Sequence, residues 1–204
     1  MNYESFRQTF ENRTLIPTND ILKRFPDFDT HRLTEWQEKG YVQKVINRFY
    51  TWQRTPLDEY KLSSVANRIY TPSYISLKSA LRWYNFIPEG VFQYFSVSTR
   101  KTKEFQTPIG DFRYKNISPH LYFGYYPVKP EKGGFLIAEP EKAILDTFYL
   151  YPHLKDELDL DGLRLNYEEI ALIFSEDKLK YYTEIFDNKR VSKLVSILIK
   201  NIAS

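Results

Sequence analysis

The most chemically suggestive spacing in this sequence is a run of acidic side chains near residue 160. The stretch ELDLDG from Glu157 to Gly162, followed by Glu168, has the spacing of a calcium-binding loop. Such loops begin with Asp, whereas this one begins with Glu, and Arg164 stands where an aliphatic residue is usual. Asn166 is better placed to cap a following helix. The sequence therefore favours an acidic loop before a capped helix, and we expect no metal site.

A second group of carboxylates could serve in acid–base catalysis. Glu139 and Glu141 lie where a helix beginning at Pro140 would start, and negative charge is favoured at a helix N-terminus in any case. Asp146 follows Lys142 by one helical turn, as in an ordinary i,i+4 ion pair. The electrostatic interpretation outweighs catalysis, and we expect no catalytic residue here.

Other chemistry is missing from the sequence. The three histidines, His31, His120 and His153, are isolated, and there is no glycine-rich phosphate loop or G-x-S-x-G motif. The absence of cysteine excludes disulfides, thiolate catalysis and cysteine-based zinc sites. We therefore expect a protein that is not an enzyme and carries no cofactor.

Residues 29–52 suggest a different kind of chemistry, which is contact with nucleic acid. Asp29 can cap a helix from Thr30 to Lys39 in which only Leu33 and Trp36 are clearly apolar. Gly40 is a suitable residue just past its end. The remaining side chains would form a polar face, and we take five of them as DNA-reading candidates: Thr30, His31, Arg32, Thr34 and Glu35.

Two strands with a polar tip between them follow this helix. Tyr41–Val45 and Phe49–Trp52 have strand-forming composition, with Asn47 and Arg48 at the turn. We expect this tip to contact the DNA backbone or the minor groove.

The segments before residue 29 complete the pattern. We expect a helix over residues 2–12, an extended segment at 15–16, and a second helix that Thr18 caps and Pro26 ends. Two short helices, a polar helix and a hairpin are the order of a winged helix-turn-helix, whose polar helix enters the major groove. The alternative is a packing motif of the same shape that contacts protein and not DNA.

From Pro56 the sequence predicts a mixed α/β region. The expected helices begin near residues 57, 76, 140 and 166, and the end of the chain is also expected to be helical, with an apolar stripe from Val191 to Ile202. Strands are expected at 92–97, 105–114, 121–128 and 135–138, with a turn on Gly110-Asp111. The fold class is therefore α+β, with a winged helix-turn-helix domain at 1–55 and a mixed α/β domain with a helical C-terminal tail at 56–204.

Charge is uneven along the chain. The net charge is 0 over residues 1–60, +7 over residues 61–135 and −4 over residues 136–204. The basic middle supplies candidates for additional phosphate contacts, namely Lys78, Arg82, Arg100, Lys101 and Lys103. The alternative is that these charges only form solvated faces of a neutral protein and have no binding role.

Membrane association is not expected. No apolar stretch approaches the ~18 residues that a spanning helix needs, and the first residues, MNYESFRQTFENR, carry charge throughout and lack the apolar core of a secretory signal. The absence of cysteine suits a reducing compartment, so we expect a cytoplasmic protein with no membrane partner.

Three blocks in the middle of the chain resemble a known family. They are YISLKSALRWYNFIPE, FSVSTRKTKEFQTPIGDFRYKNISPHLYFGY and LIAEPEKAILDTFYL. In this order and at these intervals they are similar to AbiEi-type antitoxins, the transcription-regulating partners in bacterial abortive-infection type IV toxin–antitoxin systems. The resemblance covers about residues 18–172. Glu139 stands where the family commonly has a small residue.

The resemblance implies a non-enzymatic protein that represses its own operon by binding upstream repeats in operator DNA. It also implies neutralisation of a companion AbiEii-like nucleotidyltransferase toxin, generally without stable contact. DNA reading would then fall to the residues of the polar helix and to Asn47 and Arg48. An interaction module that grips the toxin directly, without sequence-specific DNA binding, is the alternative.

Overall fold

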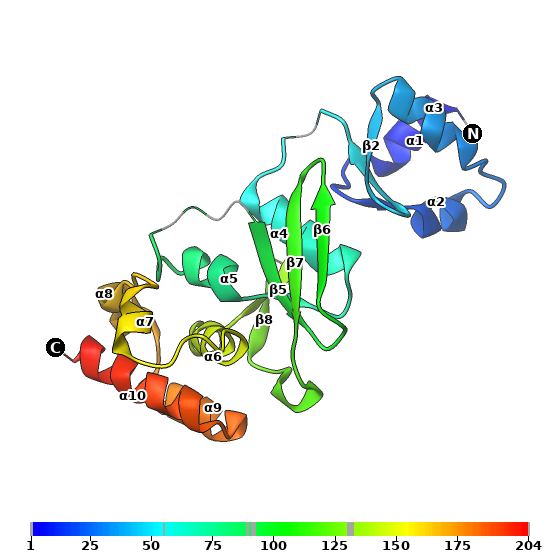
Figure 1. The fold of residues 1–204 in the computed structure, drawn as a ribbon. Helices are drawn as coiled ribbons and strands as arrows, with labels where there is room; N and C mark the ends of the chain where they lie inside the picture. The colour runs from blue at the N-terminus through cyan, green and yellow to red at the C-terminus, as the bar shows by residue number, and fades with distance from the viewer. Residues whose placement is uncertain (1, 55, 89, 91–92, 130–132, 204) are drawn as a thin grey trace.

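The computed structural model describes residues 2–54, 56–88, 90, 93–129 and 133–203, and the fold is mixed α and β (Figure 1). The boundary that we expect at residue 55 and the start of the strand at Phe92 fall outside the described residues. None of the helices in the described ranges is long and apolar enough to cross a bilayer.

Residues 2–54, the N-terminal segment, contain three helices and a small antiparallel sheet. The elements are α1 (Tyr3–Phe10), β1 (Ile16–Pro17), α2 (Thr18–Arg24), α3 (His31–Glu38), β2 (Val42–Ile46) and β3 (Phe49–Trp52). The sheet order is β1-β3-β2. The expected order of elements is confirmed, and the expected strand 41–45 is shifted by one residue.

The rest of the described chain is built on a six-stranded mixed sheet of order β6-β7-β5-β4-β9-β8. Its strands are β4 (Tyr74–Ile75), β5 (Gln93–Ser98), β6 (Lys103–Thr107), β7 (Gly110–Asn116), β8 (Tyr125–Val128) and β9 (Phe135–Ala138). The central pairs β5–β7 and β4–β9 are parallel, and the other neighbours are antiparallel.

Helices pack on this sheet, and the C-terminal helices form a further group beside one of them. They are α4 (Glu59–Ile69), α5 (Leu77–Trp83), the 3-10 turn η1 (Pro119–Leu121), α6 (Pro140–Leu150), α7 (Glu157–Asp161), α8 (Tyr167–Ile173), α9 (Glu176–Phe186) and α10 (Lys189–Ile202). Helix α4 packs on β4, β5 and β9, and α5 packs on β5 and α6. The last helices, α8 to α10, gather beside α6 at the end of the molecule farthest from the N-terminal segment (Figure 1).

Two hydrophobic cores hold these parts together. The smaller core belongs to the N-terminal segment and consists of Phe6, Phe10, Ile16, Ile21, Phe28, Leu33, Trp36 and Val42. The larger core fills the space between the six-stranded sheet and its helices. Leu15 and Val45 belong to the larger core although they precede residue 55. These two side chains therefore join the N-terminal segment to the rest of the molecule.

The structure corrects two details of local geometry. Thr18 is not an N-cap with a capping bond but the first residue of α2, because Pro17 occupies the cap position without a capping side chain. The turn between β6 and β7 lies at Pro108 and Ile109, since Thr107 pairs with Gly110. Gly110 instead starts β7 with φ +144°, a conformation that favours glycine.

The acidic residues that have the spacing of a calcium-binding loop form a short helix, α7. The Asp156 side chain accepts a hydrogen bond from the Asp159 N–H at 3.2 Å and starts α7. Residues two apart on a helix point in different directions, so the alternating carboxylates of α7 do not converge. Over the described residues, no three metal-ligating side chains come together. The predicted cap on α8 is confirmed, since Asn166 Oδ1 accepts from the Glu169 N–H.

Candidate nucleic-acid interface

Helix α3 is fixed to the N-terminal segment by two side chains. Leu33 is 2% exposed and Trp36 is 3% exposed, as the sequence predicts. The Trp36 ring lies 4.7 Å from Phe6 and 5.7 Å from Phe28 between ring centroids. Burial of such aromatic surface stabilises the helix position and leaves the opposite side of α3 without a packing role.

Both ends of α3 are set by local chemistry. The Asp29 carboxylate accepts a hydrogen bond from the His31 N–H at 2.9 Å, which satisfies a backbone donor of the first turn. Gly40 has φ +67° and ends the helix in the left-handed conformation. The helix is therefore short and has defined ends, so its polar face points in one direction.

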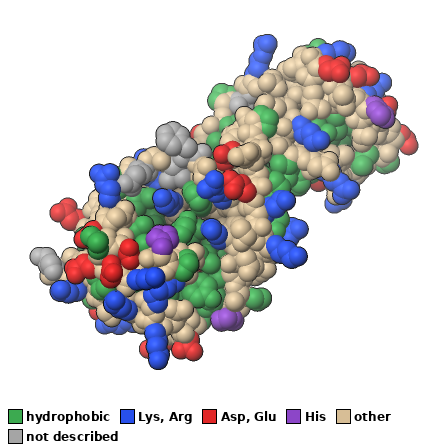
Figure 2. Space-filling view, in the orientation of Figure 1, with side chains coloured by type: hydrophobic (Ala, Val, Ile, Leu, Met, Phe, Trp, Pro, Cys, Tyr) green, Lys and Arg blue, Asp and Glu red, His purple; other side chains and the backbone are tan. Residues whose placement is uncertain are grey.

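The five predicted reading residues lie together and face solvent. All of the following are exposed: Thr30, His31, Arg32, Thr34 and Glu35. They offer hydroxyl, imidazole, guanidinium and carboxylate groups, which are the groups that read base edges in the major groove. Their formal charges cancel, because Arg32 is offset by Glu35. Figure 2 shows acidic and basic side chains intermixed on this part of the molecule (upper right).

The hairpin tip is held against the start of α2. Asn47 and Arg48 are exposed, and Arg48 adopts φ +68° at the turn. The Arg48 carbonyl accepts two hydrogen bonds, from the Thr18 N–H at 2.8 Å and from the Thr18 hydroxyl at 3.2 Å. The tip is thus fixed by its backbone, while its two side chains remain on the surface.

The two basic candidates on α5 do not extend this surface. Lys78 and Arg82 lie on α5, which is well separated from α3 (Figure 1). Arg100, Lys101 and Lys103 are exposed in and after the connection from β5 to β6. Arg100 already has structural contacts, because its guanidinium lies 4.2 Å from the centre of the Tyr70 ring and donates to the Thr71 carbonyl at 3.1 Å. The structure does not bring the α5 residues beside the polar helix.

The pair Lys142–Asp146 is different from what the sequence suggests. We expect an ordinary i,i+4 pair from the spacing, but both side chains are 0% exposed. Asp146 accepts from the Tyr74 hydroxyl at 2.9 Å and the Ser76 hydroxyl at 2.8 Å. Lys142 also donates to the Tyr74 oxygen at 2.9 Å. The polar groups satisfy one another inside the core.

Burial also changes the acid–base behaviour of this network. Loss of solvent lowers the pKa of Lys142, although the neighbouring Asp146 opposes that change. Loss of solvent raises the pKa of Tyr74, and the Asp146 charge adds to the effect. Because neither charged side chain reaches solvent, we assign the pair a structural role. The one signal in the sequence is the apolar run Ala143-Ile144-Leu145 between the two charges, which favours burial of the helix but does not distinguish a buried pair from a solvated one.

The remaining candidate carboxylates connect two helices. Glu141 is 2% exposed and accepts from the Ser175 N–H at 2.6 Å, just before α9. Glu139 accepts from the Tyr182 hydroxyl at 2.6 Å. The Lys178 ammonium lies 3.6 Å from Glu139 and 3.8 Å from Glu141. These contacts join the start of α6 to α9.

Comparison of the sequence with protein-family models and with curated proteins finds no match.

Proposed function

We propose that this chain is a DNA-binding autoregulator and antitoxin of the AbiEi type, with a winged helix-turn-helix in its first 55 residues. The observation that carries the DNA-binding part is the exposed polar face of α3, held from behind by Leu33 and Trp36. The pairing of β1 with β3, and the contact of Thr18 with Arg48, support a hairpin that acts as a wing.

In this proposal α3 enters the major groove and the hairpin tip contacts the backbone. Arg32 and Arg48 supply phosphate or base contacts, and His31, Thr34 and Glu35 supply hydrogen-bonding groups for base edges. The N-terminal segment carries 9 Lys and Arg and 7 Asp and Glu, a net charge of only +2, so nonspecific attraction to DNA would be weak. Discrimination would therefore rest on contacts to bases more than on bulk electrostatics.

The antitoxin part of the proposal rests on the resemblance of the three sequence blocks. In the structure they cover β4 and α5, most of β5 with β6, β7 and the first residue of β8, and most of β9 with α6. The corresponding partner is an AbiEii-like nucleotidyltransferase toxin in the cytoplasm, and this chain itself would have no catalytic activity.

A mobility-shift assay with the DNA upstream of the chain's own gene tests the DNA-binding part. We expect saturable binding that survives excess unrelated DNA. Equal competition by unrelated DNA would contradict an operator-specific repressor. The antitoxin part is tested separately, by asking whether co-expression of the chain restores growth to cells that express the nucleotidyltransferase encoded beside it.

A specific observation favours a second function, which is direct binding of a protein partner. Helices α7, α8 and α9 expose large apolar side chains within the acidic third of the chain: Leu158 at 79%, Leu172 at 80%, Ile173 at 45% and Tyr181 at 59%. Exposed apolar groups of this size are typical of interaction surfaces when they are clustered. Co-expression with the toxin followed by size-exclusion chromatography discriminates, since separate elution argues against direct binding.

A further inference from the structure

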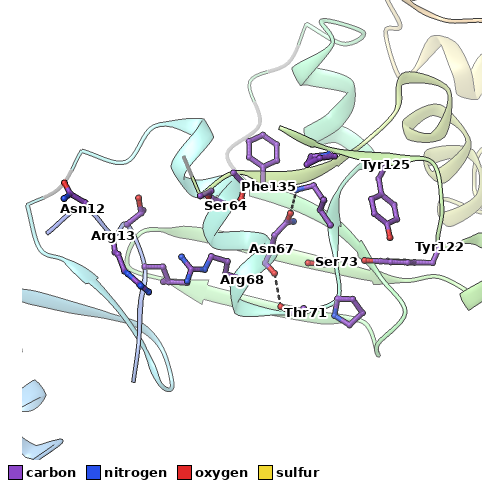
Figure 3. Close-up of a pocket in the computed structure, with 17 residues that line it drawn as sticks. Asn12, Arg13, Ser64, Asn67, Arg68, Thr71, Ser73, Tyr122, Tyr125 and Phe135 are labelled. Carbon is purple, nitrogen blue, oxygen red and sulfur yellow. Dashed lines mark hydrogen bonds between the residues drawn. The ribbon is translucent and has the colours of Figure 1, made fainter. Parts of the chain in front are cut away.

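A cavity of about 1000 Å³ lies between the N-terminal segment and the larger part of the molecule (Figure 3). Its walls come from residues 12–15, from residues 64–73 at the end of α4 and before β4, and from residues 122–127 and 133–136. This volume is at the upper end of the range found for small-molecule sites. The cavity is separate from α3 and from the Lys142–Asp146 pair.

Two residues that line the cavity carry polar atoms without a hydrogen-bond partner in the described part of the chain. Ser73 is 3% exposed, and its hydroxyl oxygen is unpaired. The Asn67 side-chain nitrogen is also buried and unpaired. Asn67 Oδ1 accepts from the Leu136 N–H at 2.5 Å, which fixes the amide so that its NH2 group is the unpaired end. Buried donors of this kind normally have a partner, which a ligand in the cavity would supply.

Positive charge is concentrated on one side of the same cavity. Arg13 and Arg68 lie side by side there (Figure 3), and none of the described residues that line the cavity is acidic. The Arg13 guanidinium also bonds Asp20 at 2.5 Å. Arg68 is an exposed residue, but loss of solvent around its guanidinium lowers its pKa; the Asp20 charge opposes this change, and the nearby Arg13 charge adds to it. One carboxylate between two guanidinium groups leaves an excess of positive charge for a ligand to neutralise.

Aromatic rings form the opposite side. Tyr122 and Tyr125 are partly buried, and their rings pack on Tyr74 at 5.1 and 4.8 Å between ring centroids. Figure 3 shows the two tyrosines across the cavity from the arginine pair. Such rings offer faces on which a planar ligand ring can stack.

We propose that this cavity binds a small organic phosphate that carries a planar ring, the class to which the mononucleotides belong. The guanidinium groups of Arg13 and Arg68 hold the phosphate, since their planar donors match its oxygens. The Asn67 NH2 group and the Ser73 hydroxyl donate the remaining hydrogen bonds, and the ring stacks on Tyr122 or Tyr125. This inference does not rest on the proposed DNA binding.

Isothermal titration calorimetry on the full chain tests the proposal with seven probes. They are AMP, CMP, GMP, UMP, inorganic phosphate, adenosine and ribose 5-phosphate. We expect at least one mononucleotide to bind more tightly than the last three probes, because these lack either the ring or the phosphate. Failure of all four mononucleotides to bind would overturn the proposal, and so would equal binding of inorganic phosphate, because the ring would then have no role.

Variants locate the binding to this cavity. Arg68→Ala removes a charged donor and is expected to weaken nucleotide affinity roughly tenfold or more. Asn67→Asp keeps the acceptor for Leu136 but replaces the NH2 group by a negative charge, so binding should be lost. Arg82→Ala, which removes a guanidinium on α5 away from the cavity, is the matched control. Unchanged affinity in Arg68→Ala and in Asn67→Asp would overturn the assignment of the site.

Ser73→Ala separates binding from folding. The Ser73 hydroxyl has no partner in the described structure, so its removal should leave the unfolding temperature the same or higher. Nucleotide affinity should still fall. A variant that binds as tightly as the parent would remove Ser73 from the site.

Discussion

Lys142 and Asp146 lie one turn apart on α6, form an ion pair, and are both completely enclosed by the core. Tyr74 bridges them, because its hydroxyl donates to Asp146 and its oxygen accepts from Lys142. Three aromatic rings, Tyr74, Phe123 and Phe186, surround the ammonium at 5.1–5.4 Å. Helix α6 is therefore fixed to β4 and α9 by a polar network inside an apolar core.

Breaking this pair should strongly destabilise the fold. Lys142→Met leaves the Asp146 charge buried without its partner, and we expect a loss of about 3–5 kcal/mol in the free energy of unfolding. The double variant Lys142→Met, Asp146→Asn removes both charges and keeps an acceptor for Tyr74. We expect it to lose less than the sum of the two single variants, as measured by urea unfolding. Additive losses would contradict direct coupling.

Alkaline pH should unfold the protein, beginning near the ordinary tyrosine pKa. Burial raises the pKa of several tyrosines above the usual 10.0, namely Tyr74, Tyr84, Tyr114 and Tyr122. The stability that they confer is complete below pH 10.0 and is lost as the pH rises above it, because the unfolded chain then releases protons more readily. Lys142 acts in the opposite sense. Because its pKa is lowered, the folded chain releases this proton before the unfolded chain does, and stability therefore rises with pH up to the ordinary lysine pKa of 10.5. Above pH 10.0 the loss of stability from the four tyrosines should exceed the gain from Lys142.

Circular dichroism and tyrosinate absorbance, followed together against pH, check this prediction. We expect unfolding and ionisation of the buried tyrosines to coincide. Tyr114→Phe should reduce the pH dependence, although it also loses the hydrogen bond to the Ala66 carbonyl. Tyr181→Phe, at a residue that is 59% exposed, is the control. Tyrosine ionisation that precedes any loss of structure would show that these side chains reach solvent in the folded state.

Removing an anchor of α3 should unfold the N-terminal segment. Trp36→Ala leaves a cavity between Phe6 and Phe28, and we expect a loss of about 3–5 kcal/mol. Glu35→Ala, one residue away on the exposed face, should change stability by no more than about 0.5 kcal/mol. Fluorescence of Trp52, whose ring lies 5.4 Å from Phe6, reports on this segment when both variants are made in a Trp83→Phe background. Equal effects of the two substitutions would contradict the division of α3 into a buried and an exposed face.

The proposed DNA contact predicts a change in salt dependence. Arg32→Ala and Arg48→Gly should each weaken operator affinity and reduce the slope of log affinity against log salt by about one unit. Glycine is suitable at residue 48 because the native φ is +68°. Thermal melts establish that each variant is folded. Parental affinity and parental salt slope in both variants would exclude this surface from DNA binding.

The sequence by itself determined much of the local structure. The periodicity of α3 identified Leu33 and Trp36 as its buried side, and Gly40 and Asn166 marked helix ends because their backbone or side-chain chemistry is local. The polar composition of residues 30–35 also identified an exposed surface in advance. These features depend on neighbours along the chain, so they can be read without the fold.

Tertiary structure decided the rest. The Lys142–Asp146 spacing is the same for a solvated pair and a buried one, and only the packing of α6 against β4 and α9 distinguishes them. The cavity beside Arg68 brings together residues from four separate stretches of the chain, so no local pattern could reveal it. Separation of α5 from α3 likewise depends on how the parts of the chain pack. Long-range contacts set the surroundings of each charge, and those surroundings determine what the charge can do.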